Sequence, residues 1–573
     1  TEDGKTEIFT DEKGYACTIP LPYGTYIVRE TTTPHNFKPV DDFTVVISEN
    51  KSEPQVWRVL LDDEFSAKLK IIKQDDETKK PVLVANTEFK IYDLDEGKYV
   101  EQTTTYPSTV THKSYFTDEN GYLILPSALK CGNYRIEEVT APDGYTQNTN
   151  YVEIKVDSNT AYQMDSTTGD AIITVVYENH PAKGKLIIHK SGETLKSFKK
   201  DFTYEETSLL GAEFAVYAAE DIYTPDGTLR CAKGEKTDSI ITGEDGKATT
   251  KPLFLGKYEI RETKAPNGYV LTNEPVYAEL KYAGQEVKIT STAVSVNNKR
   301  QKAVIRLLKY LEKDEIFNLG NTSEYTNIKF GLFATERLTA ADGSEIPADG
   351  LLEVISVDEN GNGIFTADIP VGAKLYVKET ATDGHYILSD EKYPVEFTYS
   401  GQDISSVQLI INDGKVIENR IIRGRIDGIK TDEDLNPIEK TVFGLFKPDE
   451  TVFTENTALA VTESDENGAF SFTGIPYGKW IIKELSCPDR YVLSDKLYEV
   501  NITEDGAVLS LAIKNKTVTG TVRVIKLSKA DISRKLHGAE FYIYSDTDNN
   551  GVFDPNTDIY IGRLEEAENG VYS

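Results

Sequence analysis

Cysteine and histidine are too scarce and too scattered in this sequence to build a metal or redox centre. The six histidines form no cluster with the spacing of a zinc site. The four cysteines have neither metal-like nor redox-like spacing, so we expect no disulfide framework. They are Cys17, Cys131, Cys231 and Cys487. No apolar run approaches the length of a membrane span, and no transmembrane segment is predicted.

Positive charge is also in deficit. The 573 residues include 63 Lys and Arg against 94 Asp and Glu, which gives a net charge of -31. Such a chain is repelled by nucleic acid and by anionic membranes, and its self-repulsion favours a soluble, extended form. We therefore expect neither a nucleic-acid nor an anionic-membrane partner.

A short phrase recurs along the chain. It reads YIVRETTTPHNF at 26–37, YRIEEVTAPDGY at 134–145, YEIRETKAPNGY at 258–269, LYVKETATDGHY at 375–386 and WIIKELSCPDRY at 480–491. A spacing of about one hundred residues is the size of one compact domain, so the chain is a series of similar modules. Each copy has a glutamate where the alternation of a strand points to the core. These residues are Glu30, Glu138, Glu262, Glu379 and Glu484.

Strand signals dominate the rest of the sequence. Short runs of Val, Ile, Tyr, Thr and Phe with period two are separated by Asp-Gly and Asn-Gly turns. This pattern predicts an all-β fold, with immunoglobulin-like β-sandwich domains repeated in tandem as an elongated array. The expected modules are 1–65 (truncated), 66–181, 182–300, 301–421, 422–517 and 518–573 (truncated).

Two further phrases place a lysine at the start of each module and an asparagine at its end. The opening strands carry Lys73, Lys190, Lys309, Lys430 and Lys526, and the closing strands carry Asn179, Asn298, Asn419 and Asn515. Each asparagine lies eleven positions before the next opening lysine, which fixes the register. Because the residues two positions away are mostly apolar, both side chains are predicted to point into the core.

A lysine, a glutamate and an asparagine on core faces predict a reaction. Burial lowers the pKa of a lysine and raises that of a glutamate, so a neutral amine can lie beside a protonated acid. That amine can attack the asparagine carboxamide while the glutamate hydrogen-bonds the oxygen and shuttles protons to the departing ammonia. The product is a Lys-Asn isopeptide bond, formed once and without a cofactor. The alternative is a buried ion pair capped by an amide, with no covalent bond.

The opening lysine, the Y-x-[IV]-x-E-x-x-x-P-x-G-Y box and the closing asparagine resemble the Cna B-type domains of Gram-positive surface adhesins and pilins. These domains are a prealbumin-like relative of the immunoglobulin sandwich. The resemblance covers nearly the whole chain. It implies four complete sets, namely Lys73, Glu138 and Asn179; Lys190, Glu262 and Asn298; Lys309, Glu379 and Asn419; and Lys430, Glu484 and Asn515. The third box is interpreted as having Thr382 in place of its proline, and the fourth has Arg490 in place of its glycine.

The two end modules are incomplete. The first has Glu30 and, at the asparagine position, Asp62, but it lacks the amine donor. We expect these two residues to be unbonded. The last has Lys526 but ends before its glutamate box.

An acidic loop in the last module resembles the first part of an oxygen-ligand calcium loop. Its candidate ligands are Asp546, Asp548, Asn550, Asp554 and Asp558. Thr557 occupies the position of the bidentate glutamate of an EF-hand, and a plain turn rich in Asx residues fits the same letters.

The resemblance implies an extracellular, cell-wall-attached stalk whose partners are its own neighbouring modules. Two alternatives stay open: an adhesive module that contacts a host or matrix molecule through its sandwich loops, and a pilus shaft subunit. We expect no enzymatic activity beyond single-turnover self-cross-linking, because no paired carboxylates come with a catalytic motif.

Overall fold

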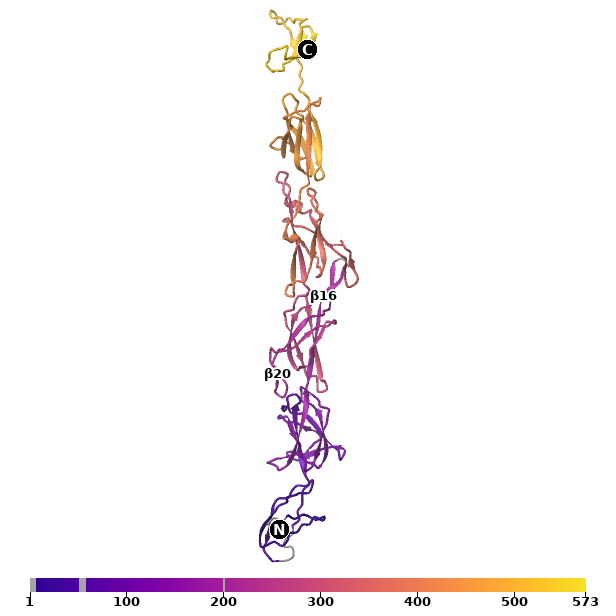
Figure 1. Cartoon of the computed structure of the whole chain (residues 1–573), viewed down its shortest axis with the longest axis vertical. Helices are drawn as coiled ribbons and strands as arrows, with labels where there is room; N and C mark the ends of the chain where they lie inside the picture. Colours follow the sequence, from indigo (N-terminus) through magenta and orange to yellow (C-terminus); the bar gives the residue numbers. More distant parts are fainter. Residues whose placement is uncertain (1–6, 51–57, 199–200) are drawn as a thin grey trace.

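The computed structural model describes residues 7–50, 58–198 and 201–573. Figure 1 shows separate β-rich units strung in single file from the N-terminus to the C-terminus, with short connections between them. Apart from one turn of α-helix, α1 (Thr322–Tyr325), and one 3-10 turn, η1 (Ile411–Gly414), the regular elements in the described ranges are strands. The predicted all-β class and elongated array are confirmed.

Each of the four complete units has two facing sheets. In the first unit, one sheet contains β3 (Ser66–Asp75), β9 (Tyr122–Ile124), β10 (Leu129–Lys130), β12 (Tyr145–Thr146), β14 (Gln163–Met164) and β15 (Ala171–Pro181). The facing sheet contains β4 (Glu88–Asp93), β5 (Lys98–Tyr99), β8 (Tyr115–Phe116), β11 (Gly132–Thr140) and β13 (Val152–Val156). In the second unit, one sheet contains β16 (Lys183–Phe198), β17 (Phe202–Ser208), β22 (Lys247–Thr249), β23 (Leu253–Phe254) and β26 (Ile289–Asn298). The facing sheet contains β18 (Glu213–Ala218), β21 (Lys236–Ile241), β24 (Gly256–Lys264) and β25 (Val276–Leu280).

The third and fourth units repeat this plan. The third has β27 (Lys302–Leu311), β32 (Asn362–Phe365), β35 (Ser406–Ile410) and β36 (Ile417–Asn419) facing β28 (Lys329–Ala334), β31 (Leu351–Ser356), β33 (Lys374–Ala381) and β34 (Lys392–Glu396). The fourth has β37 (Arg423–Thr431), β40 (Ala469–Pro476) and β43 (Val508–Lys514) facing β38 (Val442–Phe446), β39 (Ala460–Glu463), β41 (Gly478–Ser486) and β42 (Leu497–Ile502). Short two-stranded ribbons on the first three units are β6 (Gln102–Thr104) with β7 (Val110–His112), β19 (Ile222–Tyr223) with β20 (Leu229–Cys231), and β29 (Leu338–Thr339) with β30 (Glu345–Ile346).

Each of the four complete units has its own core between its two sheets. In the first, Ile71 of one sheet and Ile91 and Ile136 of the other are fully buried in one cluster. The buried residues of the other three cores lie within 186–296, 305–421 and 426–513. Burial follows the period of two, so that the opening strand β3 alternates between half-buried and buried positions along its whole length.

The ends of the chain carry smaller sheets. The N-terminal one pairs β1 (Gly24–Val28) with β2 (Phe43–Ile47). The C-terminal ones are β44 (Val524–Ile525) with β48 (Val571–Tyr572) and β47 (Glu566–Glu568), and β45 (Phe541–Ser545) with β46 (Ile559–Leu564). Among the described residues, no helix has the length and apolar character needed to cross a membrane.

The hairpin of β16 and β17 extends beside the third unit (Figure 1). Phe202 packs against the core of that unit, and the backbone N–H of Phe198 donates to Ser344 Oγ at 2.8 Å. The Tyr204 hydroxyl donates to the carbonyl of Asp368 at 2.6 Å. The hairpin therefore fastens the second unit to the third.

Candidate functional site

The first and last strands of each unit lie side by side and parallel. Lys73 of β3 is directly paired with Tyr177 of β15, which places Asn179 two residues further along. The same offset holds in every unit, with the lysine paired to the residue two before the asparagine in the second, third and fourth. Since residues two apart share one face of a strand, the lysine and the asparagine project into the same core as diagonal neighbours.

The glutamate comes from the opposite sheet. Glu138 of β11 is paired with Phe89 of β4, and a β-bulge follows it directly. The other three units show the same phenylalanine partner and the same bulge. A bulge re-aims the side chain beside it, and here the carboxylate faces the lysine across the core. Four phenylalanines thereby join the site, Phe89, Phe214, Phe330 and Phe443, each with its ring centroid 5.4 to 5.9 Å from the lysine Nζ.

In all four units the three predicted side chains touch one another. The lysine Nζ to glutamate Oε distances are 2.7 Å for Lys73 and Glu138, 3.1 Å for Lys190 and Glu262, 3.1 Å for Lys309 and Glu379, and 2.7 Å for Lys430 and Glu484. Each lysine also donates to the side-chain oxygen of its asparagine, and each asparagine donates through Nδ2 to the glutamate. The carboxylate therefore bridges the amine and the amide nitrogen. The glutamate was predicted to hydrogen-bond the amide oxygen of the asparagine, but that oxygen instead accepts from the lysine.

The sites are closed to water. All twelve side chains are buried, and the lysines expose at most 1% of their surface. Burial lowers the pKa of each lysine, and the neighbouring glutamate offsets part of that shift. An ion pair removed from water gains little net stability, so burial shifts each lysine towards its neutral form.

Backbone groups hold the glutamate in place. Ten residues after Glu138, the N–H of Asn148 donates to the carboxylate at 2.9 Å. The N–H of Thr272 does the same for Glu262 at 2.8 Å, and that of Ser389 for Glu379 at 3.0 Å. The loop after the box strand thus closes over the site that the strand supplies.

A glycine turn supports each lysine strand. The N–H of Lys309 donates to the carbonyl of Gly361 at 2.7 Å. Gly361 has φ +82°, and a Cβ there would lie 2.0 Å from the carbonyl oxygen of Lys309. Only glycine fits so close an approach with a left-handed backbone. The equivalent turns use Gly121, Gly246 and Gly468.

Each of the first three asparagine amides has an additional partner that is not shared between the units. Asn179 donates to the carbonyl of Thr146 at 2.8 Å, whereas the hydroxyl of Thr272 donates to Asn298 Oδ1 at 2.6 Å. In the third unit Asn419 Nδ2 donates to Thr382 Oγ1 at 2.9 Å.

The assignment of Thr382 to the proline position was wrong by one residue. Counting from Glu379 puts Asp383 at that position and Thr382 at the place of Ala141 in the box at 134–145. At that place the Thr382 hydroxyl accepts from Asn419.

Sequence reasoning missed the phenylalanines and the threonines. The phenylalanines had a signal, because the second strand of each unit repeats one at a fixed place in EFKIY, EFAVY, KFGLF and VFGLF. The threonines had none, since each belongs to one unit only.

The incomplete units behave differently from one another. Glu30 is half-buried and accepts the N–H of Val40 at 2.9 Å, the same ten-residue contact as in the complete units. Asp62 is half-buried two residues before Glu64, which bridges to Phe37 at the end of the first box. The prediction that every opening lysine points inward is wrong for Lys526, which is exposed because residues 518–573 provide no facing sheet with a glutamate box.

Three of the five predicted calcium ligands converge. Candidate oxygens of Asp546, Asp548 and Asp558 all lie within 4.8 Å of one another. Asn550 donates through Nδ2 to Asp548 at 2.7 Å, and the N–H of Asp554 donates to Asp558 at 2.8 Å. The N–H of Gly551 is the main cause of a lowered pKa at Asp546. Three carboxylates are a donor set suited to a hard cation such as calcium.

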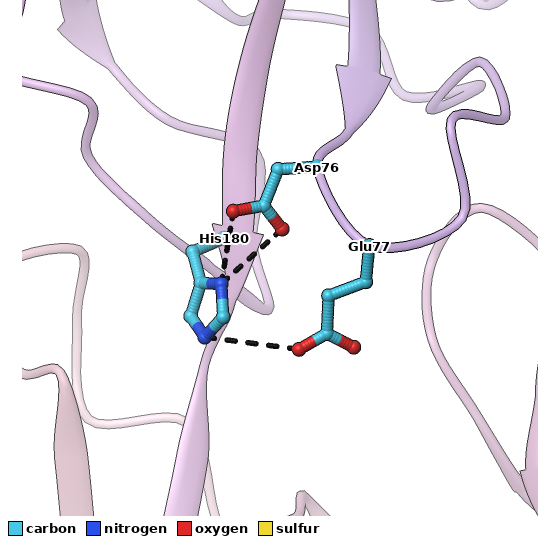
Figure 2. A group of neighbouring side chains, drawn as sticks. All are labelled: Asp76, Glu77 and His180. Carbon is cyan, nitrogen blue, oxygen red and sulfur yellow. Dashed lines mark hydrogen bonds and ion pairs between the residues drawn. The ribbon is translucent and has the colours of Figure 1, made fainter.

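A second cluster of residue types that can bind a metal ion lies next to the first triad. Figure 2 shows His180 between Asp76 and Glu77, with Nδ1 2.9 Å from Asp76 and Nε2 3.8 Å from Glu77. Glu77 also pairs with Lys183 at 2.7 Å and with Arg230 at 2.9 Å. Because these two cations already neutralise the carboxylate, the cluster is an ionic contact at the joint between the first and second units.

The fold and the recurring site define a tandem array of prealbumin-like sandwiches. A family model described as SpaA, prealbumin-like fold domain, matches residues 1–58, 67–169, 194–294 and 424–517, more than half of the chain. The chain therefore belongs to this family, which confirms the resemblance seen in the sequence. The matched ranges do not include 301–421, although that unit contains the same triad.

Individual relatives are more distant. The trypsin-resistant surface T6 protein of Streptococcus pyogenes is 27% identical over 123 residues, 21% of this chain and 20% of that protein. The chain thus spans about a fifth of the length of this curated relative. Among solved structures, the TIE protein of Bacillus anthracis is 18% identical, with a TM-score of 0.45 over 79% of this chain and 74% of that one. The major pilin subunit of Bacillus cereus is 17% identical, with a TM-score of 0.27 over 59% and 100%.

Proposed function

We propose that this chain is the structural stalk of a Gram-positive surface protein, stiffened by one self-formed Lys-Asn isopeptide bond in each complete unit. The observation that carries the proposal is the buried triad, present four times with the same register and the same bridging carboxylate. Membership of the SpaA family and the surface location named for the streptococcal relative support an extracellular, cell-wall-attached protein.

The chemistry follows from the positions of the three groups. One proton moves from the lysine Nζ to the glutamate, which leaves a neutral amine beside a neutral acid. The amine attacks Cγ of the asparagine, a new Nζ–Cγ bond forms, and the Cγ–Nδ2 bond breaks. The carboxyl group, which touches both nitrogens, carries protons from the attacking amine to the departing one, and ammonia leaves. The acid is regenerated, and nothing outside the chain is consumed.

The position of the bond explains its use. Since it would join the first strand to the last, a pull along the chain passes through the bond and bypasses most of the fold between them. Closing a loop of about one hundred residues would also stabilise each unit by roughly 4 to 5 kcal/mol on the chain-entropy account used for disulfides. A protease-resistant stalk results without any need for cysteine oxidation, which is consistent with the four cysteines being free. We expect no turnover of an external substrate.

The decisive experiment is the intact mass of the purified, unfolded chain. We expect a deficit of four ammonia molecules, one for each triad. Peptide mapping then assigns each bond to its lysine. A mass equal to that of the plain sequence would overturn the proposal and leave four buried ion pairs.

A further inference from the structure

The joints between units contain a repeated contact that the cross-linking chemistry leaves unexplained. The second unit has the segment Tyr282–Gln285 between β25 and β26, and the third has Tyr399–Gln402 between β34 and β35. We call these two the joint segments. Both read Tyr-x-Gly-Gln, and both lie against the box loop of the unit before them.

The first joint segment binds the loop that covers the first triad. Gln285 Oε1 accepts the N–H of Ala141 at 2.8 Å, and its Nε2 donates to the carbonyl of Val139 at 3.1 Å. The backbone carbonyl of Gln285 accepts the N–H of Gln147 at 3.0 Å. One glutamine therefore holds the start and the end of the loop that begins at Glu138.

The residues held in this way are the neighbours of the site. Gln147 immediately precedes Asn148, whose N–H donates to the Glu138 carboxylate, and it immediately follows Thr146, whose carbonyl accepts from Asn179. The loop so fixed determines where the carboxylate and the amide nitrogen lie relative to each other.

The second joint repeats the arrangement. Gln402 Oε1 accepts the N–H of Ala265 at 3.0 Å. The backbone carbonyl of Gln402 accepts the N–H of Leu271 at 2.9 Å. Leu271 immediately precedes Thr272, which contacts Glu262 through its N–H and Asn298 through its hydroxyl. The residues of the third and fourth units that correspond to Leu271 are Leu388 and Leu493, and each is 44% exposed.

We propose that Gln285 and Gln402 are positioning residues, through which the second and third units complete the cross-linking sites of the units before them. This inference rests on the proposed isopeptide chemistry. It makes bond formation directional: the Lys73 bond matures after the second unit has folded, and the Lys190 bond after the third. The sites of Lys309 and Lys430 mature without such help.

The test is the rate of each bond in the full chain after a pulse of labelled synthesis, followed by peptide mapping. Gln285→Ala is expected to slow the Lys73–Asn179 bond by about tenfold to a hundredfold, the scale expected for misplaced reacting groups, and to leave the other three unchanged. Gln402→Ala is expected to slow only the Lys190–Asn298 bond.

The matched control is Tyr282→Phe. It removes the hydrogen bond from the Tyr282 hydroxyl to the carbonyl of Tyr145, 3.0 Å long, and leaves all three contacts of Gln285 with the loop in place. It should weaken the joint without slowing the Lys73 bond. Unchanged rates in Gln285→Ala, or equal slowing by Tyr282→Phe, would overturn the positioning role. If the unmodified chain forms no bond in any unit, the proposed function fails, and this inference fails with it.

Discussion

Lys190 and Asn298 lie diagonally across two parallel strands, because Lys190 is in direct register with Val296. In sequence they are 108 residues apart. Their contact therefore depends on the whole unit having folded around them, with Glu262 approaching from the other sheet at 3.1 Å from the amine. The proposed bond at this point would report that the fold is complete.

Replacing the bridging carboxylate should abolish one bond and spare the others. Glu262→Gln removes the proton carrier, so we expect the Lys190–Asn298 bond to form about 10²- to 10⁴-fold more slowly. The intact mass should then show three ammonia losses. Glu279→Gln, an exposed carboxylate on the neighbouring strand β25, is the control and should keep all four. A complete Lys190 bond in Glu262→Gln would exclude the shuttle role.

Bond formation should depend on pH through the buried amine. Burial lowers the pKa of Lys73 from its ordinary value of 10.5, so the neutral amine becomes abundant at lower pH than in water. The rate should rise as the pH approaches the lowered pKa of the lysine, and it should rise no further above that pKa, because the amine is then already neutral. The stability of the unreacted fold should also rise with pH. The cost of burying the charged lysine is fully present below the lowered pKa and disappears as pH rises towards 10.5. Peptide mapping across a pH series measures the rate, and a rate still rising near pH 10.5 would show an unperturbed lysine.

The Thr272 hydroxyl should matter only in the second unit. It donates to Asn298 Oδ1 at 2.6 Å, the oxygen on which negative charge develops during attack. Thr272→Val keeps the shape and removes the donor, so the Lys190 bond should form about 10²-fold more slowly. Thr272→Ser should restore most of the rate. Equal rates in the valine and serine variants would contradict a role for the hydroxyl.

The phenylalanine beside each lysine should stabilise the unreacted unit. Phe89 is fully buried, whereas Phe116 in the same unit is 54% exposed. In a background made unable to cross-link by Asn179→Ala, Phe89→Ala should cost about 3 to 5 kcal/mol of unfolding free energy. Phe116→Ala should stay within about 0.5 kcal/mol. Denaturant unfolding of the first unit, followed by site-specific proteolysis, measures both, and similar losses would exclude a special role for Phe89.

We propose that the loop 546–558 binds calcium through Asp546, Asp548 and Asp558. Calcium should release or absorb heat in titration calorimetry and protect the loop from proteolysis, and chelation should reverse the protection. Asp548→Ala should abolish both effects, whereas Asp531→Ala, an exposed aspartate outside the loop, should preserve them. Titration without a heat signal would identify the loop as a plain turn.

The triads were predictable because a strand converts sequence spacing directly into facing. Once the alternation of β3 assigned Lys73 to the core, the same rule applied to Asn179 and Glu138. The rule predicts on which face of a strand a side chain lies, but it does not predict whether another sheet covers that face. Lys526 therefore follows the pattern and is nevertheless exposed. Which atom of the amide the glutamate would touch was also beyond the rule, because that depends on the bulge after the box glutamate.

By itself the sequence determined the all-β class, the repeated units, the register of the first and last strands, and the three residue types that meet in each core. These follow from local periodicity and from a phrase repeated at a fixed place in each unit. Only the tertiary structure decided what surrounds those residues: the phenylalanine ring near each lysine, the threonine hydroxyl that donates to one amide, and the glutamine of one unit that binds the loop beside the site of another. The threonine contact spans 26 residues of sequence and the glutamine contact 137, and their formation depends on how two sheets and two units pack.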